Sequence, residues 1–349
     1  MTETREPAAI SDITTFRDLL AGRWVGPALH AAATLNIADA LAGEPKPAVA
    51  VADAVGADPI AVQRLLRALA TIGMVGQRDG EYELTSLGAL LRADTPGRFR
   101  DQVLFTGGER SQRSWARFTD CVRTGNTATK ILDGVDDPFD WLAARPDEQT
   151  KFDAAMAEQT RQVAAAIAHA YDFSGITNIV DIGGGYGTLL PPVLHNHPAM
   201  SGIVFDRPHC ETTAEKIIAT EQLDQRYTFQ GGDFFTDALP AGADAYLLKM
   251  VIHDWDDDRS VAILRRCRDA MRDGSRLLII EVVLPERLDQ VAEHRRMIWA
   301  DLNMLVTTGG RERTETEYRA LAAAAGLAIS RILPTDTPTK LSVVEMLPS

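Results

Sequence analysis

One histidine stands where a parallel α/β sheet places its active site. A strand predicted over residues 245–250 runs directly into VIHDW (251–255), so His253 lies just past the carboxyl end of that strand. Neutral imidazole suits a general base because its unperturbed pKa lies near neutrality. Two carboxylates could orient this base: Glu281 follows the next strand-like run, and Glu312 lies in a later glycine-rich loop. A histidine with a purely structural role is the alternative.

A glycine-rich turn is the second feature with chemical meaning. The apolar run Ile179–Ile182 leads into GGGYG (183–187), which predicts a buried strand, a tight turn and a helix. Glycine allows both the turn geometry and a close approach of the backbone to a ligand. The dinucleotide fingerprint needs a third glycine at position 188, where the chain has Thr188. An adenosine ligand without a pyrophosphate, S-adenosylmethionine above all, therefore fits better; a turn without a ligand is the alternative.

Residues after the following strands could hold the rest of such a ligand. Asp206 ends the next predicted strand, where an acid accepts hydrogen bonds from ribose hydroxyls. Asp233 and Phe234 follow another short strand and could bind an adenine amino group and stack on its ring. Lys249 ends a buried strand, where an unpaired ammonium group is costly, so it should have an anionic or polar partner.

Three consecutive aspartates, residues 256–258, raise the question of a metal site. They precede a helix predicted from Arg259, where carboxylates complement the helix dipole and cap free amides. No histidine or cysteine stands at a spacing that would complete a transition-metal set. We therefore expect no metal, and a magnesium site at these aspartates is the alternative.

Composition and charge limit the classes of partner. The 349 residues carry a formal net charge of −13, which disfavours a nucleic acid or an anionic membrane. The three cysteines are far apart, which predicts neither a disulfide framework nor a zinc site. The first residues lack the pattern of a signal peptide, and no uncharged run is long enough to cross a bilayer. A cytoplasmic location is expected.

Residues 1–98 are predicted to form a mostly helical, winged-helix-like domain. Apolar side chains over residues 13–41 recur at helical spacing on more than one face, which favours a homodimer; packing within one subunit is the alternative. Helices over 48–55 and 59–72 and a hairpin with an Asp-Gly turn complete the domain. This arrangement raises DNA binding, but residues 45–92 carry five basic and five acidic side chains, whereas a phosphate-binding face is markedly basic.

The rest of the chain is predicted to form a connector and an α/β domain. Residues 99–170 are typical of helices, and some of their aromatic side chains could line an apolar pocket for a planar substrate. From residue 171 to residue 349 strands and helices alternate, which indicates a doubly wound, Rossmann-like sheet with ligands at the carboxyl ends of its strands. The runs 327–332 and 341–346 can form a closing pair of strands.

Six segments together resemble one family, the metal-independent, S-adenosylmethionine-dependent O-methyltransferases of the plant caffeate/flavonoid type and their bacterial natural-product relatives. The segments occur in the family's order and spacing, and the helical front half is similar to the family's dimerisation domain, so the resemblance covers nearly the whole chain. They are VDIGGGYG (180–187), FDRP (205–208), GDFF (232–235), LLKMVIHDWDDD (247–258), IIEVVLPE (279–286) and DLNMLVTTGGRERTETEY (301–318).

The resemblance implies roles for individual residues. His253 would take the phenolic proton, with Glu281 and Glu312 beside it. Arg161, in the helix before the sheet, looks like the residue that meets the cofactor's carboxylate in bacterial members. The other residues implied to hold the cofactor are Gly183, Asp206, Gly232, Asp233, Phe234 and Lys249.

These features predict an enzyme of secondary metabolism, such as antibiotic biosynthesis, that transfers a methyl group from S-adenosylmethionine to a hydroxyl of a small aromatic molecule. Methylation of nitrogen or carbon on an aromatic ring is the second hypothesis, because the same base serves either atom. A winged-helix regulator that senses S-adenosylmethionine is the third, and an NAD-dependent oxidoreductase is disfavoured by Thr188.

Overall fold

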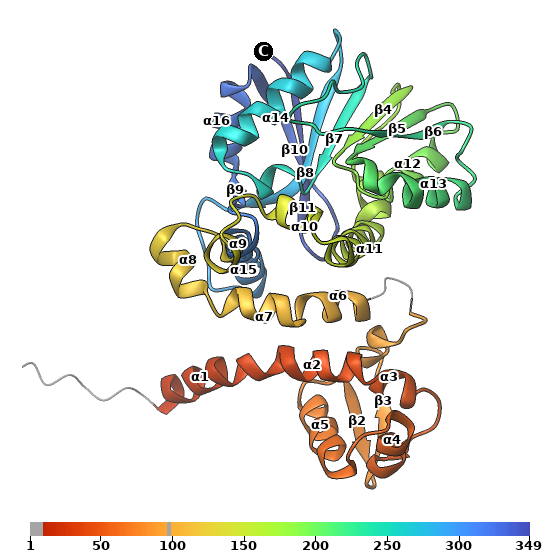
Figure 1. Cartoon of the computed structure of the whole chain (residues 1–349), viewed down its shortest axis with the longest axis vertical. Helices are drawn as coiled ribbons and strands as arrows, with labels where there is room; N and C mark the ends of the chain where they lie inside the picture. Colours follow the sequence, from red (N-terminus) through yellow and green to blue (C-terminus); the bar gives the residue numbers. More distant parts are fainter. Residues whose placement is uncertain (1–9, 96–98) are drawn as a thin grey trace, which may run out of the picture. The chain divides into compact units, whose positions relative to one another are not determined.

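The computed structural model describes residues 10–95 and 99–349, and it divides into two compact units (Figure 1). The N-terminal unit ends at Gln112, and the C-terminal unit begins at Arg113. The predicted boundary at residue 98 lies earlier, because the helix that follows it, α6 (Phe99–Thr106), packs on α2 (Val25–Thr34). The residues of the predicted connector from 113 onward belong to the C-terminal unit.

Helices dominate the N-terminal unit. The stretch with a predicted helical pattern, residues 13–41, forms three helices. A 3₁₀ turn, η1 (Gly22–Trp24), stands between α1 (Ile10–Ala21) and α2, and Asn36 (φ 55°) stands between α2 and α3 (Ile37–Ala40). Large apolar side chains of this stretch stay exposed, with fractions of 62% for Phe16, 64% for Leu19 and 61% for Trp24. An apolar surface of this kind is typical of a protein–protein contact.

The winged-helix-like part of this unit has the predicted elements. Helix α4 spans Ala48–Val55 and α5 spans Pro59–Thr71, where Asp58 caps α5 by accepting a 2.8 Å hydrogen bond from the backbone N–H of Ala61. Asp79 and Gly80 both have positive φ, as the two-residue hairpin turn requires. The sheet order is β1-β3-β2, all antiparallel. The remaining bounds are β1 (Lys46–Pro47), β2 (Val75–Arg78), β3 (Glu81–Leu84), η2 (Gly88–Leu91) and α7 (Glu109–Trp115).

A mixed sheet forms the centre of the C-terminal unit, in the order β10-β11-β8-β7-β4-β5-β6, with β9 pairing β8. The strands from β8 to β6 along this order are parallel. The predicted closing pair is β10 and β11, and it is antiparallel within itself and to β8. The strands are β4 (Asn178–Ile182), β5 (Ser201–Asp206), β6 (Tyr227–Gly231), β7 (Ala245–Lys249), β8 (Arg276–Leu284), β9 (Arg313–Thr314), β10 (Leu327–Pro334) and β11 (Leu341–Pro348).

Helices cover both faces of this sheet, and each face has its own apolar core (Figure 1). Strand β8 shows the alternation: Leu278 and Ile280 pack with α11 (Pro146–Ala170), α12 (Pro191–Asn196) and α13 (Glu211–Thr220). Leu277 and Ile279 point to the opposite face and pack with α14 (Asp257–Ala270) and α16 (Glu315–Ala324). Because β4 lies where the strand order reverses, between β7 and β5, a ligand is expected at its carboxyl end.

A smaller apolar cluster joins the helices that precede the sheet to a late helix. Cys121, Ala128 and Val306 are its fully buried members. The helices of this part are α8 (Phe118–Thr124), α9 (Ala128–Asp133), α10 (Pro138–Ala143) and α15 (Ala292–Thr307). Within the described residues, every helix is too short or too polar to cross a membrane.

Candidate active site

His253 lies in a tight turn at the carboxyl edge of the sheet. After β7 ends, Met250 takes a positive φ of 52°, and the 3₁₀ turn η4 (Ile252–Asp254) follows. The imidazole Nδ1 lies 2.9 Å from Oε1 of Glu312, and both residues are almost completely buried, 3% and 4% exposed. A carboxylate can only accept here, so in the neutral imidazole Nδ1 carries the proton and Nε2 is left to accept one. The nearest carboxylate oxygen on the Nε2 side, Oδ1 of Asp254, is 3.8 Å away.

Glu281 acts on the backbone of this turn. Its Oε1 accepts hydrogen bonds from the N–H groups of Val251, Ile252 and His253, at 2.9, 2.6 and 3.2 Å. Its Oε2 accepts from the hydroxyl of Tyr318 at 2.5 Å. Of the two carboxylates expected beside His253, Glu312 therefore contacts the imidazole, whereas Glu281 fixes the turn that carries it.

Arg313 holds the same turn from its other side, a role that the sequence did not suggest. This guanidinium is fully buried and donates to the carbonyl oxygens of Ile252 at 3.1 Å and Trp255 at 2.8 Å, and to Oδ1 of Asp257 at 2.9 Å. A β-carbon at Gly310 would lie 2.0 Å from the carbonyl oxygen of His253. Glycine is thus required at this position for the Glu312 loop to approach the histidine turn.

The buried charges around His253 shift its pKa upward. Burial alone would lower the pKa of His253, but the negative charges of Glu312 and Asp254 raise it to about 10. Burial also raises the pKa of Asp254 to about 7, against the opposing effect of His253, and it raises the pKa of Glu281. The imidazole is therefore a stronger base than a histidine in water.

The glycine turn closes around the end of β4. Gly183, Gly185 and Gly187 have φ of 69°, 55° and 72°, a conformation that L-residues rarely adopt. A β-carbon at Gly183 would lie 2.8 Å from the side chain of Val251, so the turn approaches the His253 segment closely. The N–H of Gly185 donates to Oδ2 of Asp206 at 2.6 Å. This hydrogen bond links the glycine turn to Asp206, the residue predicted to bind the ribose hydroxyls.

The GDFF segment lies next to Asp206. The N–H of Gly232 donates to the carbonyl oxygen of Asp206 at 2.9 Å, and a β-carbon at Gly232 would lie 2.5 Å from the ring of Phe205. Asp233 Oδ1 accepts from the N–H of Phe235 at 2.7 Å. The half-buried Phe234 ring has its centroid 6.1 Å from that of Trp255, and its edge would lie 3.7 Å from a β-carbon at Gly183. The ring of Phe234, the predicted adenine-stacking residue, therefore stands beside the glycine turn.

The half-buried Lys249 and the buried Asp181 carry charges that act on each other. The ammonium of Lys249 donates to Oγ1 of Thr160 at 3.0 Å, the polar partner expected for it, and burial lowers its pKa to about 8. Asp181, on β4, is 1% exposed, and among the described residues neither of its carboxylate oxygens has a hydrogen-bond partner. Burial raises the pKa of Asp181 to about 7, opposed by the charge of Lys249. An acid inside the apolar run before the glycines was the signal that could have identified Asp181 from the sequence.

Arg161 lies at a surface hollow, and the three aspartates lie at the start of a helix. Arg161 pairs with Glu158 at 3.0 Å and lines a surface hollow of about 120 Å³ with Thr188, Pro191 and His195. Its binding of the cofactor's carboxylate stays a prediction. Asp256 caps α14 by accepting from the N–H of Arg259 at 2.8 Å, and residues 257 and 258 form the acidic first turn, as the simpler interpretation predicted.

Comparisons with known proteins place the chain in one family. Residues 115–328 match the O-methyltransferase domain, and residues 17–94 match the O-methyltransferase dimerisation domain. The chain belongs to this family and is an S-adenosylmethionine-dependent O-methyltransferase. The predicted family and the α/β fold with a helical N-terminal dimerisation domain are confirmed, and with them the expectation of a homodimer.

Three relatives show the range of this family. Phenazine O-methyltransferase PhzM from Lysobacter antibioticus is 41% identical over 349 residues, 100% of both chains. 8-amino-8-demethylriboflavin N,N-dimethyltransferase from Streptomyces davaonensis is 35% identical and aligns over 88% of this chain and 87% of its own. The crystal structure of the O-methyltransferase NcsB1 from neocarzinostatin biosynthesis, in complex with S-adenosylmethionine and 2-hydroxy-5-methyl naphthoic acid, has a TM-score of 0.77 at 34% identity, covering 93% of this chain and 96% of its own.

The residues of this chain fit S-adenosylmethionine. That cofactor carries an ammonium group and a sulfonium, and both oxygens of the buried Asp181 carboxylate are without a hydrogen-bond partner among the described residues. Gly183, Gly184 and Gly185 carry no β-carbons, so a ligand can approach the backbone there. Asp206 ends β5, and Asp233 stands two residues after β6.

Proposed function

We propose that this enzyme methylates a hydroxyl group of a small aromatic natural product and that His253 is the general base. The contact between Nδ1 of His253 and Oε1 of Glu312 carries the proposal, because it leaves Nε2 as the basic nitrogen. When bound, S-adenosylmethionine supplies an electrophilic methyl group. The protein must then align the acceptor oxygen with that group at roughly 3 Å, and Nε2 takes the hydroxyl proton as the oxygen attacks.

The pKa of His253 matches this task. A phenol has a pKa of about 10, and the carboxylates around His253 raise its pKa to about 10 against the effect of burial. Proton transfer between two groups of similar pKa costs little free energy, so the proton can move to Nε2 during attack. The Glu312 carboxylate stabilises the imidazolium that results, and Glu281 and Arg313 keep the turn in place.

The cofactor would be held at the ends of β4 to β7. Asp206 is proposed to bind the ribose hydroxyls, and Asp233 and Phe234 the adenine, beside the backbone of Gly183 and Gly232. Asp181 would attract the cationic end of the cofactor. Lys249 would donate its hydrogen bond to Thr160 and offset part of the negative charge of Asp181. Arg161 is proposed as a contact of the cofactor's carboxylate by resemblance alone.

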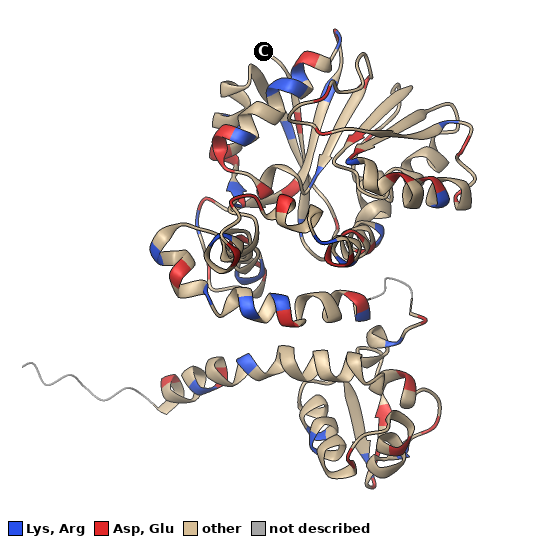
Figure 2. Cartoon of the chain, viewed as in Figure 1, with Lys and Arg blue, Asp and Glu red and all other residues tan. Residues whose placement is uncertain are grey.

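The acceptor class is proposed from the relatives. Phenazine and naphthoic acid rings appear in their names, so a fused aromatic ring with a hydroxyl group is the first candidate. An aromatic amine is the second, because a relative 35% identical is an N,N-dimethyltransferase. A regulator that binds DNA is not favoured, because α5 offers only Arg64 and Arg67 and acidic residues accompany the basic ones over the N-terminal unit (Figure 2).

We further propose that the enzyme works in the cytoplasm, in secondary metabolism. Its three cysteines are free and buried, as expected for a protein of a reducing compartment.

Transfer of labelled methyl from S-adenosylmethionine to a panel of hydroxylated phenazines, hydroxynaphthoates and the matching aromatic amines tests the acceptor proposal. We expect methylated hydroxyl products. Methylation of the amines alone would replace the O-methylation proposal by N-methylation, and binding of the cofactor without any methylated product would reject the acceptor class.

A further inference from the structure

We propose that Asp153, His209 and Cys210 form a zinc-binding site in the C-terminal unit. None of these residues is His253 or a residue proposed to contact the cofactor, although Asp206 precedes His209 closely in the chain and its charge acts on Cys210 and Asp153. The proposal concerns metal binding and does not depend on the identity of the methyl acceptor.

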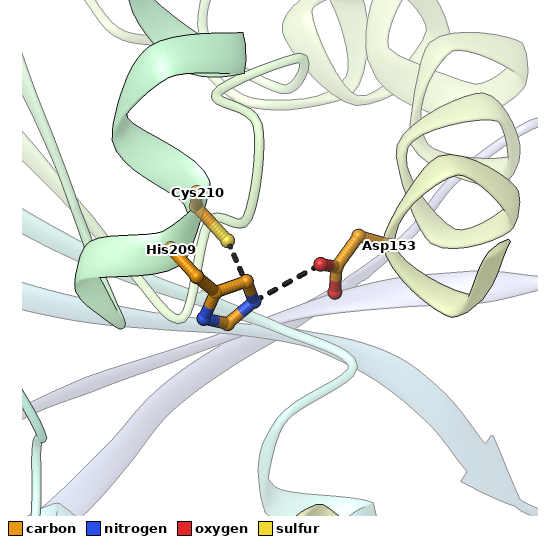
Figure 3. A group of neighbouring side chains, drawn as sticks. All are labelled: Asp153, His209 and Cys210. Atoms are coloured by element: carbon orange, nitrogen blue, oxygen red, sulfur yellow. Dashed lines mark hydrogen bonds and ion pairs between the residues drawn. The ribbon is translucent and has the colours of Figure 1, made fainter. Parts of the chain in front are cut away.

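The three side chains converge from two elements (Figure 3). Asp153 lies on α11, and His209 and Cys210 lie on η3 (Pro208–Cys210), directly after β5. His209 Nε2 is 3.0 Å from Oδ2 of Asp153 and 3.4 Å from Sγ of Cys210, and all three ligand atoms lie within 4.8 Å of one another. With zinc bonds of about 2.0–2.3 Å, a tetrahedral site separates its donor atoms by roughly 3.3–3.7 Å. Small side-chain adjustments therefore suffice for one ion to reach all three atoms.

The donor set is the kind that zinc prefers. Zinc binds thiolate sulfur, imidazole nitrogen and carboxylate oxygen, whereas magnesium and calcium prefer oxygen ligands alone. One thiolate, one carboxylate and one neutral imidazole neutralise the ion's two positive charges. The His209 side chain is 38% exposed, so solvent can reach the site and supply a fourth ligand. The site thus has three protein ligands and one open position.

Hydrogen bonds alone satisfy this group less well than a metal would. His209 Nε2 faces both Asp153 and Cys210, and a single N–H cannot donate well to both the carboxylate and the sulfur. A metal at the centre uses the lone pairs of all three atoms at once. Gln149 donates to the other oxygen of Asp153, Oδ1, at 2.8 Å, which orients Oδ2 toward His209. This is the arrangement that an outer hydrogen bond gives to a metal ligand.

Binding must release the thiol proton. Zinc binds cysteine as the thiolate, and a thiol with an ordinary pKa of about 8.5 is mostly protonated at neutral pH. A bound ion takes the place of that proton, which passes to solvent, and His209 must carry its own proton on Nδ1. Metal affinity should therefore rise with pH. A bound ion would also tie α11 to the segment after Asp206 and stabilise the folded chain.

Cobalt(II) titration of the metal-stripped, full-length protein tests the site. We expect one equivalent to give visible bands of tetrahedral cobalt and a near-ultraviolet band from thiolate to cobalt, both displaced by Zn²⁺. Cys210→Ser should abolish the near-ultraviolet band, and Asp153→Asn and His209→Ala should each weaken binding at least tenfold. Cys121→Ser is the matched control, because that cysteine is also buried but has no place in the cluster.

The change in Tm on adding Zn²⁺ is a second measure of metal binding, and it can be compared between variants of different stability. Zn²⁺ should raise the Tm of the wild type and of Cys121→Ser but leave the Tm of Asp153→Asn unchanged. Absence of the thiolate band in the wild type would overturn the proposal. Retention of that band in Cys210→Ser would also overturn it. If Asp153→Asn and His209→Ala bound cobalt as the wild type does, the wild type would hold an adventitious ion only.

Discussion

Nδ1 of His253 and Oε1 of Glu312 lie 2.9 Å apart, and water reaches almost none of either side chain. This contact fixes the ring, assigns the proton to Nδ1 and places a negative charge next to the base. After burial, which lowers the pKa of His253, the Glu312 charge is the largest influence on it and raises it. One side-chain pair thus sets the orientation and the basicity of the proposed base together.

Replacing Glu312 by glutamine should separate these two effects. The new amide oxygen can still accept from Nδ1, but the charge is gone, so the pKa of His253 should fall. We expect kcat to drop at least tenfold at alkaline pH and the rise of kcat/KM to move to lower pH. Glu315→Gln, at an exposed position on α16, is the control. A pH profile equal to that of the wild type would exclude Glu312 from tuning the base.

The wild-type pH profile is a second prediction. His253 must be unprotonated to accept a proton, and its pKa is raised to about 10. In the free enzyme the active fraction therefore grows about tenfold for each pH unit below that value. We expect kcat/KM for a phenolic acceptor to keep rising above pH 8. A profile that levels off below pH 7 would contradict the raised pKa.

Arg313→Lys should disturb the turn more than it disturbs the cofactor. A lysine cannot reach the carbonyl oxygens of Ile252 and Trp255 and the Asp257 carboxylate together. We expect a loss of about 1–3 kcal/mol in the free energy of unfolding and a lower kcat, with the Kd of S-adenosylmethionine within twofold of wild type. Arg311→Lys, a half-exposed neighbour that also pairs with Asp257, should change little. Equal effects of the two substitutions would show that Arg313 does not hold the His253 turn.

Asp181→Asn should stabilise the folded chain at alkaline pH and weaken cofactor binding. Burial raises the pKa of Asp181 in the folded chain from 3.8 to about 7. A raised carboxyl pKa stabilises the folded state below pH 4 relative to higher pH, and this contribution is lost as pH rises through 7. At pH 8 the variant should therefore be more stable than wild type, by on the order of 2–4 kcal/mol, and this gain should vanish near pH 4.

Urea unfolding at the two pH values measures the free energy of unfolding, and calorimetric titration with S-adenosylmethionine measures cofactor affinity. We expect the variant to bind the cofactor at least tenfold more weakly. Unchanged affinity would show that Asp181 does not meet the cofactor.

Local patterns in the sequence were sufficient for the elements and for the edge of the sheet where the site lies. Asp58 before Pro59 predicted the start of a helix, and the Asp79-Gly80 pair predicted a hairpin, because both depend on neighbours in the chain. The roles of Glu281 and Arg313 depend on segments that meet only in the folded chain. Sequence reasoning placed Glu281 beside the imidazole, whereas its carboxylate binds the backbone of residues 251–253.

Long-range contacts also explain what was missed. The spacing of the cysteines in the sequence predicts no zinc site, and it does not reveal that α11 brings Asp153 next to Cys210 from a distant part of the chain. The full burial of Arg313 was not predictable from the sequence, because arginine side chains are usually exposed.

The most direct test of the account compares His253→Ala with wild type in single-turnover methyl transfer from labelled S-adenosylmethionine, with cofactor affinity measured on the same samples. Loss of the base should slow transfer about 10²–10⁴-fold, while the Kd of the cofactor stays within a few-fold, because no cofactor-binding residue is changed. Methyl transfer at the wild-type rate in His253→Ala would contradict the account and remove His253 from the reaction.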